Sequence, residues 1–421
     1  MRIALIGAGE RGIIYSQYAH EQLGYTISAV ADPNPQRIQL ARDLFSIEES
    51  QCFLDGCDLI AQVKDIDAVI IASMDRDHFR HTMAALECGF DILLEKPISP
   101  DARECLAIRE RAEQTGCNVT VCHVLRYAPF FIRVKEILDS GEIGNIVAID
   151  HTENIGNFHI AHSFVRGNWR NSKQSSPIVM QKSCHDMDIL LWLTQSSAKS
   201  IASVGSLSYF RAEHAPQGSA ERCLDCAVAE NCRYEARKAY LPTMGAWPSR
   251  VLTADQTEAG LMKAFREGPY GRCVFRCDND VCDHQSTVIE FENGVSATFT
   301  LCGMTNEMHR TIHVMCEDGE LFGDDLTGVI RVVKFRSNQA DAFEESVFVV
   351  GTVSGNHGGG DEGLVNDFAA KLVQPDAMES RSSIRNSIES HLMACAAEES
   401  RLTGQTISMR AFEDRFLERD C

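Results

Sequence analysis

The chain has 421 residues, of which 44% are hydrophobic and 24% are charged, as in an ordinary folded protein. At about 150 residues per domain, this length predicts two or three domains. Asp and Glu (60) outnumber Lys and Arg (40), and the net charge of −20 disfavours nucleic acid and membrane surfaces as partners. No apolar run of ~18 residues and no export signal is apparent. We therefore expect a cytoplasmic protein with mostly reduced thiols among its 17 cysteines.

The first 125 residues alternate short apolar segments with helical patterns. Such alternation predicts crossover units and an α/β fold with a doubly wound parallel sheet. The expected strands are Ile3–Ile6, Tyr25–Ala31, Asp67–Ser73, Asp91–Glu95 and Asn118–Val124.

From residue 126 onward the pattern changes to alternating strands. This indicates a second α/β domain, residues 126–421, with a large open and mostly antiparallel sheet. A polar, Cys-containing insertion interrupts it at about 213–284. We expect one helix over Ile178–Leu193 and two closing helices, at Glu362–Leu372 and Ser382–Glu399. The expected strands are Ile146–Glu153, Lys199–Phe210, Ser286–Phe291, Val295–Cys302, Thr311–Cys316, Val329–Phe335 and Ser346–Val350.

A glycine motif, Gly7-x-Gly9-x-x-Gly12, lies between the first strand and the first helix, and Asp32 ends the second strand. In this context, N–H groups at the helix N-terminus bind a dinucleotide pyrophosphate, and the acidic residue binds the adenosine ribose. Because a carboxylate repels a 2′-phosphate, we expect NAD rather than NADP. Arg11 is placed to contact phosphate. A purely structural glycine turn is the alternative.

Two further motifs carry groups suited to acid–base chemistry. Glu95 ends the fourth expected strand and Lys96 follows it, at the sheet edge where ligands bind, and the lysine could stabilise a developing oxyanion. In the first expected helix of the second domain, Lys182, His185 and Asp188 are spaced by three and share a face. His185 is a candidate general acid or base, and Lys182 would keep it neutral. A surface lysine and a packing histidine are the alternatives.

The insertion contains Cys223-x2-Cys226-x5-Cys232, followed by Cys273 and Cys277. Three close thiols and a later fourth could form a tetrahedral zinc site. We take Cys273 as the tentative fourth ligand, although the spacing does not choose between it and Cys277. Such a zinc would be structural, since four thiolates leave no open position. Free thiols, an iron–sulfur cluster or a disulfide stay open as alternatives.

The glycine motif, the strand-ending Glu-Lys-Pro and the helical histidine together resemble the Gfo/Idh/MocA oxidoreductase family, which includes glucose–fructose oxidoreductase and inositol dehydrogenase. The resemblance covers nearly the whole chain outside the insertion. It implies a Rossmann NAD-binding domain at 1–125 and a substrate and oligomerisation domain at 126–421. It also implies hydride transfer to or from a sugar, glycoside or cyclitol, and a homo-oligomer, dimer or tetramer. Lys96 and His185 match the family's catalytic lysine and histidine.

Other positions match family segments near the ligands. For the cofactor these are Ser73, His78, Glu95, Lys96, Trp169 and Arg170, and for the substrate His123, Arg126, Tyr127 and Asp188. His357 lies in a glycine loop just before a helix and could contact a sugar hydroxyl, and an ordinary loop with a helix cap is the alternative. The histidines at 151, 159 and 162 could also line the substrate pocket, or be solvated loop residues.

The chain departs from the family at Gln181, where many members have an aspartate four residues before the histidine. Because an amide cannot relay a proton, we expect Lys182 to take over part of that role. The departure keeps open a redox-neutral, NAD-dependent glycoside cleavage through a transient keto-sugar. A non-enzymatic NAD-sensing regulator is the second alternative.

Overall fold

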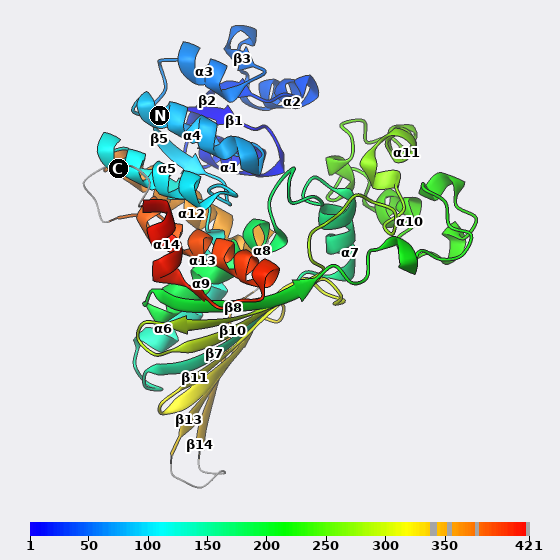
Figure 1. Ribbon diagram of the computed structural model, residues 1–421. Helices are drawn as coiled ribbons and strands as arrows, with labels where there is room; N and C mark the ends of the chain where they lie inside the picture. The colour runs from blue at the N-terminus through cyan, green and yellow to red at the C-terminus, as the bar shows by residue number, and fades with distance from the viewer. Residues whose placement is uncertain (337–342, 352–355, 375–378, 418–421) are drawn as a thin grey trace.

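The computed structural model describes residues 1–336, 343–351, 356–374 and 379–417. Figure 1 shows an N-terminal α/β domain in blue, a long twisted sheet below it, and a loop-rich insertion in green beside both. No helix within the described ranges is long and apolar enough to cross a bilayer.

The N-terminal sheet has six parallel strands in the order β3-β2-β1-β4-β5-β6. The expected doubly wound parallel sheet is confirmed. Strand β3 has two residues, too few to show a pattern in the sequence. The strands are β1 (Arg2–Ile6), β2 (Thr26–Ala31), β3 (Cys52–Phe53), β4 (Ala68–Ile71), β5 (Asp91–Leu94) and β6 (Val119–Val121).

Helices flank this sheet, and the local sequence sets their ends. Asn34 caps α2 by accepting from a backbone N–H, with Pro35 at the first helical position. Asp101 caps α5 in the same way, and Gly116, with φ +71°, ends it. The helices are α1 (Glu10–Glu21), α2 (Pro35–Phe45), α3 (Gly56–Gln62), α4 (His78–Glu87) and α5 (Ala102–Thr115).

The second sheet has nine strands in the order β14-β13-β12-β11-β7-β10-β9-β8-β15. Among the strands that the structure describes, only β7 and β10 pair in parallel, so the expected mostly antiparallel sheet is confirmed. Strands β12 and β15 were not expected from the sequence. The strands are β7 (Ile146–Asn154), β8 (Ala198–Ser206), β9 (His284–Phe291), β10 (Ser296–Cys302), β11 (His309–Cys316), β12 (Gly319–Asp324), β13 (Val329–Phe335), β14 (Phe343–Val349) and β15 (Ile407–Ser408).

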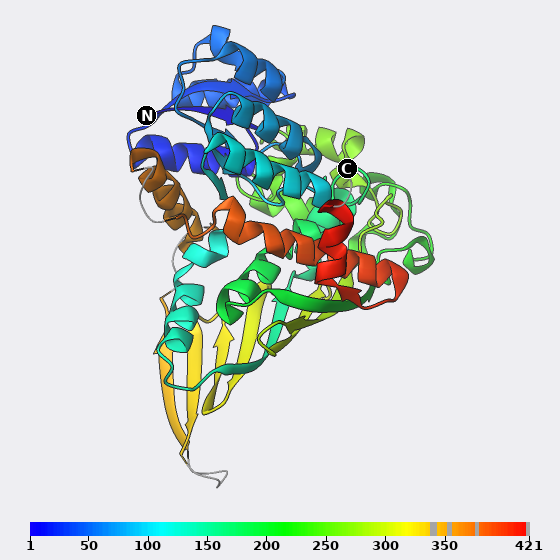
Figure 2. The same ribbon diagram turned by 60° about the vertical axis from the view of Figure 1, so that its left-hand side comes forward.

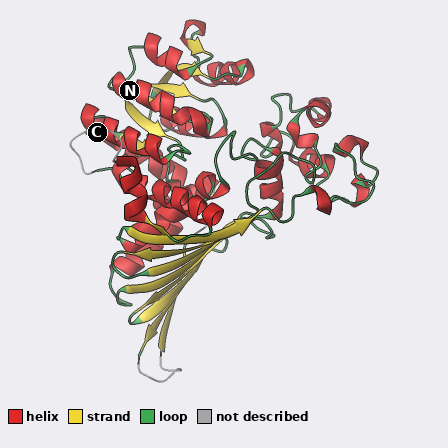
Figure 3. Ribbon diagram, viewed as in Figure 1, coloured by secondary structure: helices red, strands yellow, loops and turns green. Residues whose placement is uncertain are grey.

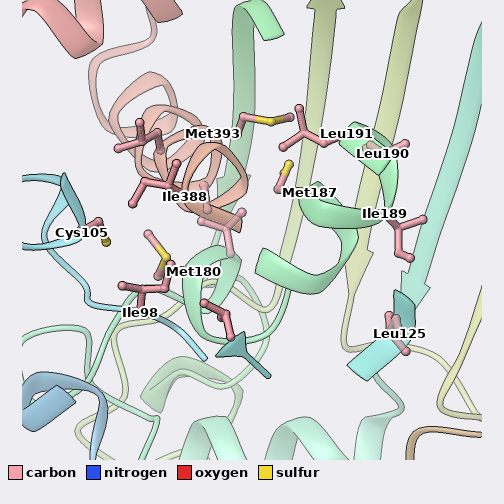
Figure 4. Close-up of a cluster of buried hydrophobic side chains, with 14 of the residues drawn as sticks. Ile98, Cys105, Leu125, Met180, Met187, Ile189, Leu190, Leu191, Ile388 and Met393 are labelled. Atoms are coloured by element: carbon pink, nitrogen blue, oxygen red, sulfur yellow. The ribbon is translucent and has the colours of Figure 1, made fainter. Parts of the chain in front are cut away.

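Helices cover one face of this sheet and join it to the first domain. Figure 2 shows α13 (Ile384–Thr403) lying between the N-terminal helices and the sheet. Figure 4 shows the apolar contacts there, with Ile98 and Cys105 of the first domain near Met180 and Ile388 of the second. The remaining helices of this layer are α6 (Pro129–Asp139), α8 (Ile178–Gln181), α9 (Cys184–Thr194) and α14 (Met409–Leu417). Helix α12 (Gly360–Val373) packs instead against α1 and the core of the first domain.

The prediction of a single helix over 178–193 is wrong, because the segment is broken into α8 and α9 at Lys182 and Ser183. The carbonyl of Gln181, which would accept from the His185 N–H in a continuous helix, accepts from the Lys96 side chain instead. A tertiary contact therefore replaces a helical hydrogen bond at this point.

The insertion lies between β8 and β9 and consists mainly of loops, as Figure 3 shows. It contains α10 (Ala236–Tyr240) and α11 (Glu258–Glu267), packed on a small core of its own that includes Tyr240 and Phe265. Against it lie α7 (Asn157–His159) and the π-helical segment η4 (Ile160–Arg166).

Candidate active site

The glycine loop after β1 is shaped for a close approach of backbone to ligand. Gly7 has φ +91°, and a Cβ there would lie 2.3 Å from the Ala72 carbonyl oxygen. A Cβ at Gly12 would lie 2.1 Å from the Gly7 carbonyl oxygen. A Cβ at Gly9 would meet no atom closer than the Arg37 guanidinium, at 3.5 Å. Gly9 precedes α1, so the unpaired N–H groups of that helix adjoin an open side of the loop, as a pyrophosphate requires.

Asp32 ends β2 beside this loop. Its carboxylate accepts from the Ala8 N–H at 2.9 Å and from the Asn34 N–H at 2.8 Å, and the residue is 4% exposed. Each carboxylate oxygen has a further lone pair, so both can also accept from ribose hydroxyls. The loop and Asp32 together fit the NAD that the sequence predicts.

Arg11 lies in a buried ion-pair network. Its Nε is 3.1 Å from Glu95 Oε1, and its Nη1 is 3.1 Å from Asp361 on α12. Tyr15 also donates to Glu95, at 2.8 Å. Burial raises the pKa of Glu95, but Arg11 and Lys96 lower it overall. The contacts of Arg11 that the structure describes are all with protein groups. Its contact with phosphate therefore stays a prediction.

Lys96 lies just after β5, and both its backbone and its side chain are hydrogen-bonded. Its backbone N–H donates to Glu95 Oε2 at 2.8 Å. Its Nζ donates to the Gln181 carbonyl at 2.8 Å, across the domain boundary. The lysine therefore joins the carboxyl end of the Rossmann sheet to the segment that leads into His185.

Three buried histidines gather beside this lysine. The ring of His185 lies edge-on to that of His123, with centroids 5.7 Å apart. On the His123 ring also lies His391, with centroids 5.3 Å apart. Burial, with Arg126 and Lys96, holds the pKa of His123 well below its usual range. Among the described residues, Nδ1 of His123 has no hydrogen-bond partner. Because His123 is fully buried, its contact with a substrate hydroxyl stays a prediction.

Lys182 belongs to a second charged cluster, on the inner face of the sheet. Its Nζ lies 3.4 Å from Glu153 Oε1, and Arg310 bridges Glu153 and Asp186. Burial raises the pKa of Glu153 to about 7, against the effect of Arg310. Burial also lowers the pKa of Lys182, which Glu153 opposes. His151, expected near the substrate, instead lies in this cluster at 2.8 Å from Asp186.

Glu153, Asp186 and Arg310 were missed by the sequence analysis. Strand alternation offered one signal, because His151 and Glu153 lie two residues apart and point to the same face. Arg310 joins this cluster through the register between the two strands, because Arg310 on β11 pairs with Glu153 on β7.

Arg126 and Asp188, expected at the substrate, form a buried two-point ion pair. The two hydrogen bonds measure 2.7 and 2.8 Å, and Asp188 is fully buried. Arg126 also donates to the carbonyls of Arg381 and Asn386. Tyr127 donates to Asp367 on α12 at 2.7 Å. These contacts hold α9, α12 and α13 together, and a substrate contact by any of the three stays a prediction.

The loops after β4 and β5 are tied together beside the expected nicotinamide position. Ser73 Oγ lies 3.0 Å from His81 Nδ1. The ring nitrogens of His78 lie 2.7 Å from the Pro97 carbonyl and 3.1 Å from the Ser73 carbonyl. His78 is thus a buried connection between the two loops, and direct contact of Ser73 or His78 with the cofactor stays a prediction.

Trp169 and Arg170 lie on a loop between the first domain and the insertion. Trp169 Nε1 is 3.4 Å from Asp75, just after β4. Arg170 Nε donates to Asp278 of the insertion at 2.8 Å. Their expected contact with the cofactor is a prediction. His357 lies in a 3-10 segment, Asn356–Gly359, but its side chain is outside what the structure describes.

The insertion brings together the four cysteines taken as metal ligands, around one small cavity of about 20 Å³. Cys273 lines this cavity, whereas the Cys277 thiol donates to the Cys273 carbonyl at 3.3 Å. The zinc itself stays a prediction. The four lining cysteines are Cys223, Cys226, Cys232 and Cys273.

Comparison with known proteins agrees with this architecture. Residues 1–123 match the oxidoreductase family's NAD-binding Rossmann fold, and residues 135–409 match its C-terminal alpha/beta domain. The chain belongs to the Gfo/Idh/MocA oxidoreductase family. The resemblance drawn from the sequence motifs is therefore confirmed, and with it NAD binding as a property of the family.

Individual members of the Gfo/Idh/MocA family are distant from this chain. YteT of Bacillus subtilis (strain 168), named as an oxidoreductase, is 24% identical over 82% of each chain. Inositol 2-dehydrogenase 4 of Saccharopolyspora erythraea is 28% identical over 46% of this chain and 54% of its own length. Levoglucosan dehydrogenase, solved with NADH and levoglucosan, has a TM-score of 0.71 at 18% identity, covering 97% of this chain and 99% of that one. Scyllo-inositol dehydrogenase of Lactobacillus casei has a TM-score of 0.67 at 16% identity, with the same coverage.

Proposed function

We propose that the protein is an NAD-dependent dehydrogenase that transfers hydride between nicotinamide and a hydroxyl-bearing carbon of a sugar, glycoside or cyclitol. The proposal rests on Lys96, which follows strand β5 of the NAD-binding sheet and binds the segment leading into His185. The similarity to proteins named inositol 2-dehydrogenase and levoglucosan dehydrogenase supports a polyhydroxylated substrate.

The chain's own residues supply the positioning and the proton transfer. When bound, NAD supplies the nicotinamide carbon that accepts or returns the hydride. Lys96 Nζ donates to the substrate oxygen and stabilises the negative charge that develops there. His185 takes the hydroxyl proton as general base.

The proton then needs an acceptor in place of the family's aspartate, because Gln181 cannot carry one. Lys182 follows Gln181 directly, and its ammonium is 3.4 Å from Glu153. A carboxyl group with a pKa of about 7 exchanges protons readily near neutral pH. We infer that Lys182 and Glu153 together take over the aspartate's role.

Substitution of Lys96 tests the proposal. Lys96→Met should lower kcat by about 10²–10³-fold, the effect of removing one oxyanion donor. Lys199→Met, at an exposed ion pair on β8, is the matched control and should leave kcat unchanged. An unchanged kcat in Lys96→Met would contradict the assigned role.

Three finer features belong to the same proposal. Asp32 favours NAD over NADP by repelling a 2′-phosphate. A homo-oligomer would use the outer face of the long sheet, where Val147, Val204 and Val288 are 54%, 71% and 54% exposed. A cytoplasmic location is supported by the described cysteines, all of which are unpaired. Molar mass in solution by light scattering tests the oligomer, and a monomer at micromolar concentration would contradict it.

A further inference from the structure

Three side chains of metal-ligand type, none of which the hydride transfer uses, lie together in the N-terminal domain. One ligand atom each from Asp55, Cys57 and His81 lies within 4.8 Å of the other two. Asp55 is the N-cap of α3, Cys57 lies in the first turn of that helix, and His81 lies on α4, which packs against α3. Two neighbouring helices therefore bring a carboxylate, a thiol and an imidazole to one point.

The histidine has a nitrogen that no protein group uses. His81 is 3% exposed, and its Nδ1 lies 3.0 Å from Ser73 Oγ. Its Nε2 is buried and has no hydrogen-bond partner in the described part of the chain. A Cβ added at Gly56 would lie 2.8 Å from this Nε2, so the nitrogen lies against the backbone between Asp55 and Cys57. A buried nitrogen without a partner is costly, and a metal ion at this point supplies the missing bond.

The carboxylate keeps room for a further contact. Asp55 Oδ1 accepts from the Cys57 N–H at 2.8 Å, and Oδ2 accepts from Arg80 Nη1 at 2.6 Å. Each oxygen has a second lone pair, so Asp55 can bind a metal ion while it caps the helix and holds the arginine.

The charges around the three side chains favour a divalent cation. Arg80 pairs with Asp77 at 2.9 Å as well as with Asp55, and its Nη1 lies 3.7 Å from Cys57 Sγ. Without a metal, two carboxylates therefore share one guanidinium. Once Cys57 is a thiolate, the three negative charges balance Arg80 and one divalent ion, so the site has its counter-charges in place.

The imidazole and the thiol are in the protonation states from which a metal site forms. Burial and Arg80 lower the pKa of His81 to about 4, so its ring is neutral near pH 7. Burial raises the pKa of Cys57, although Arg80 lowers it, so the thiol keeps its proton until a metal binds. Binding then releases that proton to solvent.

The donor set and its spacing select zinc. A thiolate, an imidazole and a carboxylate are the ligands that Zn²⁺ takes, whereas Mg²⁺ and Ca²⁺ take oxygen atoms. A tetrahedral zinc with bonds of about 2.0–2.3 Å holds its ligand atoms about 3.3–3.6 Å apart. Since the three atoms already lie within 4.8 Å of one another, shifts of about 1 Å in the half-buried side chains of Asp55 and Cys57 close the site.

We propose that Asp55, Cys57 and His81 bind one Zn²⁺ ion, with water as the fourth ligand. The partial exposure of Asp55 and Cys57 lets solvent reach that fourth position. Zinc on Nε2 of His81 places the ring proton on Nδ1, which then donates to Ser73 Oγ. The ion thus ties the start of α3 to α4 and to the loop after β4, and its role is structural.

The zinc content of the full-length protein tests the proposal. Protein dialysed against zinc chloride and then freed of unbound metal would be analysed by mass spectrometry. Cys57→Ser and His81→Gln should each hold one zinc per chain fewer than the wild type. A wild type without zinc, or a wild-type zinc content in either variant, would overturn the proposal.

Asp55→Asn separates the ligand role from the helix cap, because Asn caps a helix as well as Asp does. In competition with a chelator, this variant should bind zinc at least about 10-fold more weakly than the wild type, while its melting temperature in the chelator stays close to that of the wild type. Unchanged zinc affinity in Asp55→Asn would also overturn the assignment.

Cys52→Ser is the matched control. Cys52 is another half-buried cysteine, on β3, and its thiol donates to the Glu48 carbonyl at 3.5 Å. This variant should keep the zinc, and loss of zinc from it would overturn the ligand set. Zinc held by the insertion's cysteines would be present in every variant, so it cancels in the difference from the wild type. Metal content does not depend on turnover, so the result is independent of the proposed dehydrogenase activity.

Discussion

Replacing Asp188 by Asn distinguishes a structural from a substrate-binding role for the Arg126–Asp188 pair. The substitution keeps the shape of the side chain but removes its charge. It leaves the Arg126 guanidinium buried with neutral acceptors alone, namely the new amide oxygen and the Arg381 and Asn386 carbonyls, at 2.6 and 3.1 Å. Burial already raises the pKa of Asp188, although Arg126 lowers it, so the pair depends on both of its members.

The expected loss of stability is large. Removing one member of a buried ion pair costs about 3–5 kcal/mol. At about 2 °C per kcal/mol for larger domains, thermal unfolding followed by circular dichroism should shift down by about 6 °C or more. Asp58→Asn, at an exposed position of α3, should change stability by less than about 0.5 kcal/mol.

A double variant completes the test. Arg126→Met with Asp188→Leu removes both charges and should recover much of the loss, because apolar residues replace a buried pair at little cost. KM for the sugar should change little in any variant that folds. An unchanged melting temperature in Asp188→Asn, together with a tenfold rise in KM, would refute the structural role.

Three further predictions concern the glycine loop, acid stability and the proton path. Gly7→Ala should abolish NAD binding in calorimetry, because its Cβ would lie 2.3 Å from the Ala72 carbonyl oxygen. Gly89→Ala, at φ +78° in open space, is the control and should lower the free energy of unfolding by only about 1 kcal/mol. Equal effects of the two substitutions would contradict this. Burial lowers the pKa of His81 and His162 to about 4 and of His391 to about 3. A histidine in the unfolded chain has a pKa of about 6.5, so below that pH the unfolded state binds protons that the folded state does not. Urea unfolding should therefore show the free energy of unfolding falling by about 1.4 kcal/mol per pH unit and per histidine below that pH. A free energy of unfolding that does not change between pH 7 and 5 would refute this. Glu153→Gln should lower kcat and remove a titration near pH 7 from the pH–rate profile, and an unchanged profile would exclude Glu153 from the proton path.

The features that the sequence indicates most directly are those encoded in neighbouring residues. The glycine motif and Asp32 depend on a strand, a turn and a helix in succession, so their spacing alone indicates the site. Spacing also groups the cysteines at 223, 226 and 232, which line one cavity with Cys273, and their role as metal ligands stays a prediction. The bridge between Arg222 and Arg272 brings the chain at Cys273 beside the chain at Cys223, and no local pattern encodes it.

The features that were missed depend on contacts between distant segments. The helix break at Lys182 follows from the bond between Lys96 and the Gln181 carbonyl, 85 residues apart in the chain. Arg126 and Asp188 are 62 residues apart, and each alone reads as a polar residue near a substrate pocket. Their pairing is set by how the helices pack, so sequence spacing could not distinguish an ion pair from a ligand contact.

A substrate panel with NAD tests the central claim most directly. Sugars, cyclitols and aryl glycosides would be offered in turn, with NADH absorbance and product release followed in parallel. The account predicts NADH formation in step with a keto product for at least one sugar or cyclitol, and loss of both signals in Lys96→Met. Release of an aglycone without accumulation of NADH would contradict it, and would instead establish redox-neutral bond cleavage.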